Sequence, residues 1–314
     1  MSKPRTVFMG TPDFAVPALE GLVRGGYPIV GVVTQPDRPR GRGLSLTPPP
    51  VKLLAARLDL PLYQPQKVRA PEFLETFRVL APELVVVAAF GQILPAAIIR
   101  GPRWGCVNIH PSLLPKYRGA APINWPLIQG DQTTGVTIMR MDEGVDSGEI
   151  LLQEATPIGP EETFGELHDR LAKIGAELLL ISLAMMASGT LVPRQQDHGL
   201  ATQAPRLGRE DTRIHWEKPS RQIVSLIRGL SPSPGAHTEL DGKQLKIYRA
   251  SAEVVAVPGV PGTVLGGADG EIRIAAADGA VLLREVQLEG KKRMTGRDFL
   301  RGFPIQPGKI LGRG

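Results

Sequence analysis

Short apolar runs alternate with helix-like segments over the first 190 residues of the chain. Near-continuous apolar runs such as LVVVAA, residues 84–89, suit strands of a parallel sheet that is covered on both faces. The expected strands are 6–10, 28–34, 61–64, 83–90, 105–109, 135–141 and 149–156, and the expected helices are 13–26, 49–59, 70–82 and 163–189. This alternation predicts an α/β domain with a doubly wound, mostly parallel sheet.

The pattern changes after the expected long helix. Residues 190–205 are polar and contain Pro and Gly, which indicates a linker. Beyond it, a short helix at 219–230 precedes apolar runs that are separated by Gly-containing turns, at 244–252, 270–279 and 280–290. Short strands at this spacing suggest a small β-barrel, such as an OB-like one, or a sandwich. We expect a first domain over 1–189 and a smaller β-barrel domain over 206–314.

Composition narrows the class of protein. The 314 residues are 42% hydrophobic, which supports a sizeable core. The N-terminal residues show no apolar signal region, and no run approaches the roughly 18 apolar residues of a membrane span. The single Cys106 excludes an internal disulfide and a multi-cysteine metal site. We therefore expect a soluble, cytoplasmic protein that does not enter a membrane.

The charge is distributed unevenly. From Arg206 to the end the chain carries 18 Lys and Arg against 12 Asp and Glu, whereas residues 1–205 carry 19 of each. The formal net charge of +6 therefore belongs to the last third of the chain. A neutral body with a basic appendage suggests a polyanionic partner, but a merely basic, solvated domain explains the charge equally well.

Two polar residues interrupt the expected strand at 105–109. Asn108 and His110 lie two positions apart and so share one face, near the end of the strand where ligand crevices form in open α/β sheets. Pro111 cannot donate a ladder hydrogen bond and ends the strand there. A lone histidine at a strand end is more often structural than catalytic. The asparagine two positions earlier and the proline-bounded loop make a functional interpretation as plausible.

A carboxylate partner for His110 must come from another segment. The acidic cluster at 142–146 would usually be a solvated turn, but Gly144 and Gly148 allow the loop to bring Asp146 back toward the crevice. A neighbouring carboxylate favours the imidazolium form of a histidine, which can donate to developing negative charge. Asn108 offers a neutral amide donor for the same purpose. Together these groups suggest acyl transfer without a covalent nucleophile.

Four motifs resemble the methionyl-tRNA formyltransferase family: FMGTPDFAVPALEGL, TQPDRPRGRG, NIHPSLLPKYRGAAPINW and GVTIMRMDEGVDSGEI. The resemblance is specific up to about residue 190 and looser beyond it. It implies a Rossmann-like formyltransferase domain that moves the formyl group of 10-formyltetrahydrofolate to the α-amine of methionyl initiator tRNA, without a metal. The family's catalytic Asn, His and Asp fall on Asn108, His110 and Asp146.

The resemblance also implies binding residues for the two substrates. The family's folate motif falls on Ser112, Leu113, Leu114 and Pro115, and residues 90–95, with Phe90 and Ile93, correspond to a loop that lines the pterin pocket. Arg38, Arg40 and Arg42 lie in a stretch rich in Pro and Gly that is either a solvated loop or, as in the family, a loop that grips the tRNA acceptor end.

In the last third of the chain the resemblance is loose, and it assigns no individual tRNA-contacting residues there. The basic run Lys291, Lys292 and Arg293 in this region is our candidate for tRNA phosphates, and we expect a monomer of the bacterial, cytoplasmic type.

Three other functions remain open from the sequence. Another folate-dependent formyltransferase, acting on a nucleotide-sugar or ribotide amine, would share the Asn, His and Asp but should lack the arginine loop and the basic domain. A hydrolase that releases formate from the folate would not need a basic appendage. A non-catalytic RNA-binding module would not need the triad. No G-x-G-x-x-G follows the first expected strand, and no Walker-type motif occurs in the chain.

Overall fold

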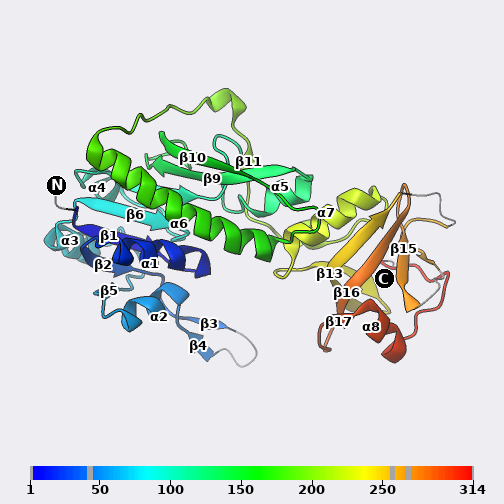
Figure 1. The fold of residues 1–314 in the computed structure, drawn as a ribbon. Coiled ribbons are helices and arrows are strands. Elements are labelled where there is room, and N and C mark those ends of the chain that lie inside the picture. The colour runs from blue at the N-terminus through cyan, green and yellow to red at the C-terminus, as the bar shows by residue number, and fades with distance from the viewer. Residues whose placement is uncertain (1–2, 41–44, 255–258, 266–269, 313–314) are drawn as a thin grey trace. The chain divides into compact units, whose positions relative to one another are not determined.

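The computed structural model describes residues 3–40, 45–254, 259–265 and 270–312. Two compact units make up the chain (Figure 1). The first unit comprises Met1–Pro122, Thr134–Thr156 and His168–Ala204, and the second comprises Ile123–Thr133, Pro157–Leu167 and Pro205–Gly314.

A seven-stranded sheet forms the centre of the first unit. Its strands are β1 (Thr6–Gly10), β2 (Ile29–Val33), β5 (Leu62–Tyr63), β6 (Leu84–Ala88), β7 (Cys106–His110), β9 (Thr133–Arg140) and β10 (Ile150–Pro157). They are ordered β10-β9-β7-β6-β1-β2-β5. The pairs from β5 to β7 are parallel, and β9 runs antiparallel to β7. The predicted doubly wound, mostly parallel sheet is confirmed.

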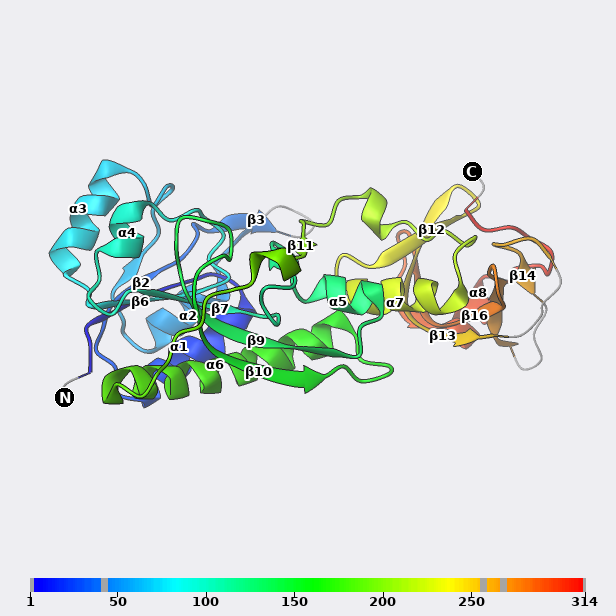
Figure 2. The same ribbon diagram turned by 90° about the horizontal axis from the view of Figure 1, so that it is seen from above.

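Helices cover both faces of this sheet. Figures 1 and 2 place α1 (Val16–Arg24) and α6 (Phe164–Ser188) on one face and α3 (Pro71–Leu80) and α4 (Ala96–Arg100) on the other. The central strands β1 and β6 are buried along their whole length, which explains why their sequences carry no polar alternation. The remaining helix, α2 (Pro50–Arg57), follows a short hairpin of β3 (Arg38–Arg40) and β4 (Ser45–Thr47).

The long helix α6 modifies one expectation from the sequence. By length and composition alone it is apolar enough to cross a membrane, although no such run was expected. A helix from the centre of a folded domain passes the same test. Leu167, Leu171, Leu179 and Leu183 on this helix are completely buried within the fold, so we assign α6 to the protein core.

An antiparallel sheet and two helices form most of the second unit. The strands are β12 (Ala236–Leu240), β13 (Lys243–Glu253), β14 (Val264–Leu265), β15 (Ile272–Ala275), β16 (Ala280–Leu288) and β17 (Met294–Thr295). They are ordered β12-β13-β16-β15-β14, and β17 pairs with β16. Two register shifts around Arg249 in β13 mark an irregularity that helps the sheet to curl. Among the described strands the sheet does not close, so the smaller β-barrel takes the form of a curled half-barrel.

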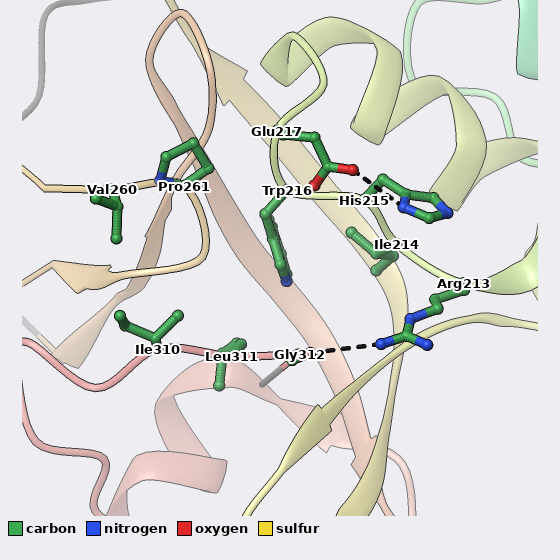
Figure 3. Close-up of a pocket in the computed structure, with 10 residues that line it drawn as sticks. All are labelled: Arg213, Ile214, His215, Trp216, Glu217, Val260, Pro261, Ile310, Leu311 and Gly312. Atoms are coloured by element: carbon green, nitrogen blue, oxygen red, sulfur yellow. Dashed lines mark hydrogen bonds and ion pairs between the residues drawn. The ribbon is translucent and has the colours of Figure 1, made fainter. Parts of the chain in front are cut away.

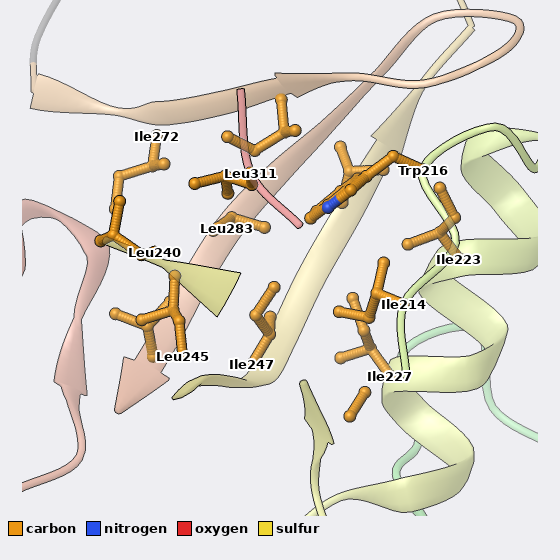
Figure 4. Close-up of a cluster of buried hydrophobic side chains, with 14 of the residues drawn as sticks. Ile214, Trp216, Ile223, Ile227, Leu240, Leu245, Ile247, Ile272, Leu283 and Leu311 are labelled. Atoms are coloured by element: carbon orange, nitrogen blue, oxygen red, sulfur yellow. The ribbon is translucent and has the colours of Figure 1, made fainter. Parts of the chain in front are cut away.

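The core of the second unit is built mainly from apolar side chains. Figure 4 shows Ile223 and Ile227 of α7 (Ser220–Leu230) facing Ile247 of β13. The indole of Trp216 is 4% exposed and donates through Nε1 to the Thr238 hydroxyl at 3.1 Å, so its one polar atom is satisfied. Helix α8 (Gly296–Gly302) contributes Phe299 to the same cluster. Burial of these side chains is the main stabilising contribution available to this unit.

The two units do not coincide with the expected division of the chain. Helix α5 (Asn124–Gln129) and residues 157–167, expected in the first domain, cluster with the second unit. Residues up to Ala204, expected as a linker, cluster with the first unit, where β11 (Gln203–Ala204) pairs with β8 (Arg118–Gly119). The assignment of a catalytic domain to 1–189, a linker to 190–205 and a tRNA-binding domain to 206–314 stays a prediction.

Candidate active site

Strand β7 presents Asn108 and His110 on one face near its carboxyl end. Cys106, which lies on the same face of the strand, packs with Val85, Val87 and Ile98 in the core. Asn108 is half-buried, and no described residue forms a hydrogen bond with its side chain. A half-buried amide without a protein partner is available to a ligand that enters this end of the strand.

Both ring nitrogens of His110 face fixed oxygen atoms. The imidazole is 3% exposed, and its Nε2 lies 3.0 Å from the backbone carbonyl oxygen of Tyr117. A carbonyl only accepts hydrogen bonds, so Nε2 carries a hydrogen and donates it. Nδ1 lies 3.6 Å from Asp146 Oδ1, too far for a good hydrogen bond but close enough for an ion pair. Nδ1 is therefore the nitrogen that can gain or donate a proton during a reaction.

The loop between β9 and β10 brings Asp146 to His110, as the sequence suggested. Asp146 adopts a left-handed backbone conformation with φ +49°, which an aspartate tolerates better than most residues. Its Oδ2 accepts a hydrogen bond from the backbone N–H of Gly119 at 2.9 Å. Gly148 permits the tight return of the loop, since a Cβ there would lie 1.9 Å from the carbonyl oxygen of Arg140. The carboxylate is thus held from two sides.

The described side chains near His110 include no activated nucleophile. Burial raises the pKa of the Cys106 thiol, so this residue stays uncharged. The Ser112 hydroxyl is fully buried and donates to the carbonyl oxygen of Lys116 at 2.7 Å. Asn108, His110 and Asp146 can instead donate hydrogen bonds and move a proton, which suits direct transfer of an acyl group between two amines.

The expected folate motif forms the loop that follows β7, and most of it is structural. Ser112 closes the loop, and the Leu114 N–H donates to Thr137 Oγ1 at 3.1 Å. Leu114 is buried against Met139 and Ile150, whereas Leu113 and Pro115 are half-buried. Leu113 and Pro115 are therefore the members of the motif that a ligand could reach.

The loop after β6 begins beside Asn108, because Val87 pairs with Asn108 across the two strands. Phe90 is 3% exposed and packs in the core, and its carbonyl oxygen accepts a hydrogen bond from Thr11 Oγ1 at 3.0 Å. Ile93, in contrast, is 92% exposed. Of the two predicted pterin contacts, Ile93 is free to cover a ligand, while Phe90 shapes the loop from beneath.

The expected arginine loop is described in part. Arg38 is exposed and donates from Nη2 to the Gln35 side chain at 3.1 Å. Asp37 beside it accepts hydrogen bonds from Lys52, which lower the pKa of the Asp37 carboxyl. Arg42 and the side chain of Arg40 lie outside the described residues. Their expected role in tRNA binding stays a prediction.

The basic run at 291–293 is exposed, but its members differ in their partners. The Arg293 guanidinium pairs with Glu285 and lies 4.4 Å from the centroid of the Tyr248 ring. Lys291 lies over the Phe303 ring at 5.5 Å. Lys292 pairs with no other described residue, so it is the most available of the three for a phosphate.

Four further residues support the site and were not predicted from the sequence. Tyr117 and Gly119 act through backbone groups, which leave no signature in the residue type. Arg118 and Gln196 act through buried side chains that bond to each other, 78 positions apart. Of the four, only Gly119 could have been noticed in the sequence, because its residue type is a glycine. The structure requires a glycine there, since Gly119 has φ +123° and a Cβ would lie 2.7 Å from the Ala204 carbonyl oxygen.

A separate cavity of about 420 Å³ lies in the second unit. Figure 3 shows Trp216 at its centre, with Val260 and Ile310 on one side and His215 paired with Glu217 above. The indole N–H of Trp216 is already used by Thr238. The cavity contains none of the predicted catalytic residues, so its size alone does not identify it as the reaction centre.

Comparison with known proteins gives the family. The Formyl transferase model matches residues 4–183, and the model of the Formyl transferase C-terminal domain matches residues 206–304. The methionyl-tRNA formyltransferase of Syntrophus aciditrophicus is 53% identical over 99% of this chain and 100% of its own length. Within the described ranges, no group of three or more His, Cys, Asp or Glu side chains could hold a metal ion.

Solved structures agree on the fold. The methionyl-tRNA formyltransferase from Clostridium thermocellum superimposes with a TM-score of 0.56 at 17% identity, over 79% of this chain and 93% of that one. HypX from Aquifex aeolicus, solved in complex with tetrahydrofolic acid, gives a TM-score of 0.64 at 17% identity, over 100% of this chain and 51% of that protein. The match over the whole length, at about half of all positions, shows that the chain belongs to the methionyl-tRNA formyltransferase family.

Proposed function

We propose that this protein transfers the formyl group of 10-formyltetrahydrofolate to the α-amine of methionyl initiator tRNA. The observation that carries the proposal is the arrangement at the end of β7. There the unpartnered amide of Asn108 lies on the same strand face as His110, and Asp146 lies 3.6 Å from His110 Nδ1. Full-length similarity to proteins named methionyl-tRNA formyltransferase supports this choice of substrates.

Asn108, His110 and Asp146 have different roles in this reaction. The neutral amine of the methionyl ester attacks the formyl carbon, which forms the new C–N bond and a tetrahedral oxyanion. Asn108 Nδ2 and Nδ1 of the protonated His110 ring donate hydrogen bonds to this oxyanion, because Nε2 is already bonded to Tyr117. Asp146 accepts the proton that the attacking amine loses. Asp146 passes this proton to the folate nitrogen as the bond between that nitrogen and the carbon breaks, so the products are formylmethionyl-tRNA and tetrahydrofolate.

We assign the donor to the first unit and the tRNA to basic side chains of both units. Leu113, Pro115 and Ile93 are the exposed or half-buried members of the predicted folate contacts. Arg38, Arg40 and Arg42 would hold the acceptor end, and Lys291, Lys292 and Arg293 would hold phosphates, with Lys292 the least occupied. In this proposal the protein is a cytoplasmic monomer that needs neither a membrane nor a metal.

One assay tests the proposal directly. Labelled formyl groups from 10-formyltetrahydrofolate should appear on charged initiator tRNA and much less on charged elongator methionine tRNA. An amino sugar linked to a nucleotide and a ribotide amine serve as alternative acceptors. Transfer to either of these but not to the charged tRNA would replace the proposed acceptor, and release of free formate alone would replace transfer with hydrolysis.

A further inference from the structure

The segment that follows α6 packs directly on the loops of the candidate site. Arg194 exchanges two backbone hydrogen bonds with Ile150, each 2.8 Å long. Further along, the Arg118 N–H donates to the Thr202 carbonyl at 2.9 Å, and the Ala121 N–H donates to the Ala204 carbonyl at 3.0 Å. All of these residues belong to the first unit. We call residues 194–204 the support segment.

Gln196 of the support segment holds the backbone of the Asp146 loop. Its side chain is 5% exposed, and its Nε2 donates to the carbonyl oxygens of Asp146 at 2.9 Å and Gly148 at 2.7 Å. Its Oε1 accepts hydrogen bonds from Arg118 Nε at 3.1 Å and Nη2 at 2.6 Å. The amide thus uses both of its N–H groups and accepts two hydrogen bonds, a full set that no other side chain of this size reproduces.

Thr202 of the same segment holds Tyr117. Its Oγ1 accepts a hydrogen bond from the Tyr117 N–H at 2.9 Å. Tyr117 has φ +65°, a left-handed conformation that is strained for an ordinary residue and persists only where its surroundings enforce it. This conformation points the Tyr117 carbonyl at His110 Nε2, 3.0 Å away.

These contacts meet at His110. One ring nitrogen faces Tyr117, which Thr202 holds, and the other faces Asp146, which Gln196 holds. We propose that Gln196 and Thr202 are positioning residues that set the tautomer of His110 and its distance from Asp146. This inference rests on the proposed function for its reaction but concerns residues that touch neither substrate. Misplacement of a reacting group by about 1 Å can cost on the order of a hundredfold in rate.

Four variants of the full-length chain separate the contacts. Gln196→Met keeps the length of the side chain without its hydrogen bonds. Gln196→Glu keeps acceptors for Arg118 but loses the donors to the two carbonyls, so it should fail as Gln196→Met does. Thr202→Val removes only the hydroxyl, and Thr202→Ser restores it. We expect kcat for formyl transfer to fall about tenfold to a hundredfold in the first three and to recover in Thr202→Ser.

The matched control is Gln195→Met. Gln195 is the exposed neighbour of Gln196, and among the residues that the structure describes its amide bonds only to the Glu149 side chain, at 2.9 Å. This variant should keep the wild-type kcat. In all variants KM for tRNA and folate affinity should stay within about twofold of wild type, since the altered atoms lie behind the reacting groups rather than in contact with them.

A spectroscopic measurement distinguishes positioning from a general loss of stability. In protein labelled with ¹⁵N-histidine, the His110 signals, assigned by their absence from His110→Ala, should show the Nε2–H tautomer in neutral wild type. Thr202→Val should give a mixture of tautomers, whereas a weakened but correctly arranged fold would keep the wild-type pattern.

The outcomes are separable. An unchanged kcat in Gln196→Met, a loss confined to KM, or an unchanged tautomer in Thr202→Val with full activity would overturn the inference. Wild-type protein that forms no formylmethionyl-tRNA would instead overturn the proposed function, and the tautomer measurement would still decide the role of Thr202.

Discussion

The two units differ in the polar side chains that they bury. In the first unit His110, Ser112, Arg118, Thr137 and Gln196 are all less than a tenth exposed and bond to specific protein atoms. In the second unit the buried polar side chains, such as Asn124, Ser220 and Thr238, are uncharged, and the charged side chains remain at the surface, many in ion pairs. These pairs include Arg249–Glu166, Arg273–Glu253, Arg284–Glu271 and Arg293–Glu285.

This difference separates two kinds of function. Buried polar groups with fixed partners have one geometry and act in a poorly screened environment, which suits a chemical step. Exposed charged side chains around an apolar core can adopt many geometries. At 0.1 M, salt largely screens their interactions beyond about 10 Å, and such salt-dependent attraction suits a large polyanion. The comparison predicts that substitutions of the buried polar side chains in the first unit change kcat and that substitutions of surface charge in the second change salt-dependent binding.

The largest expected effect comes from the triad. Asn108→Ala, His110→Ala and Asp146→Ala should each lower kcat by about a hundredfold to a thousandfold, the usual effect of losing a donor to an oxyanion. Substrate affinity should change far less, because these contacts strengthen in the transition state. Steady-state kinetics of full-length variants measure both quantities. A variant with near-normal kcat would remove its residue from the mechanism.

A smaller effect is expected from the core of the second unit. Ile247 is fully buried between β12 and β16, and Ile247→Val removes one methylene group. The free energy of unfolding should fall by about 0.5 to 1.5 kcal/mol, measured by denaturant titration. The kcat at 25 °C should be unchanged. A large loss of kcat in a folded Ile247→Val protein would show that the chemistry depends on the second unit.

The smallest effect concerns pH and the start of α6. The Glu166 carboxylate accepts hydrogen bonds from Thr163, chiefly from its backbone N–H, which lowers the pKa of Glu166 from 4.5 to about 2. A carboxyl whose pKa is lower in the folded state stabilises the protein above its unfolded pKa, and this stability is lost as the pH falls from about 4.5 toward 2.

The Glu166 side chain is 49% exposed, so solvent screening limits the effect to below about 1 kcal/mol. Glu166→Gln should therefore lose stability at pH 7 and approach wild type near pH 2.5, as followed by thermal unfolding. An equal loss at both pH values would mean that the charge of Glu166 has no part in the effect.

Much of the site could be predicted because its signals are local. Alternation along β7 placed Asn108 and His110 on one face, and the spacing of Gly144 and Gly148 favoured a loop that returns Asp146 to them. The near-continuous apolar runs likewise predicted the parallel sheet. These inferences depend only on the geometry of one strand or one loop, which neighbouring residues determine.

The support segment could not be predicted in the same way. Residues 190–205 have no repeating apolar face, so their pattern indicates a linker, although Gln196 is buried and β11 pairs with β8. Helix α5 was also missed, because six residues with Pro126 inside them are too short to show a helical period. Both features depend on contacts with residues distant in sequence, and no local pattern encodes such contacts.

Chemistry and electrostatic attraction reside in different groups of this protein, and a salt series separates the two. We would measure kcat/KM for charged initiator tRNA between 50 and 200 mM salt, the range over which phosphate binding weakens most visibly (roughly threefold to fourfold for each phosphate). Wild type is compared with His110→Ala and with Lys291, Lys292 and Arg293 all changed to Gln. His110→Ala should lower the line of log kcat/KM against log salt and leave its slope unchanged. The triple variant should flatten the slope by up to about 0.9 for each phosphate that the protein no longer neutralises. A changed slope in His110→Ala, or a wild-type slope in the triple variant, would contradict the account.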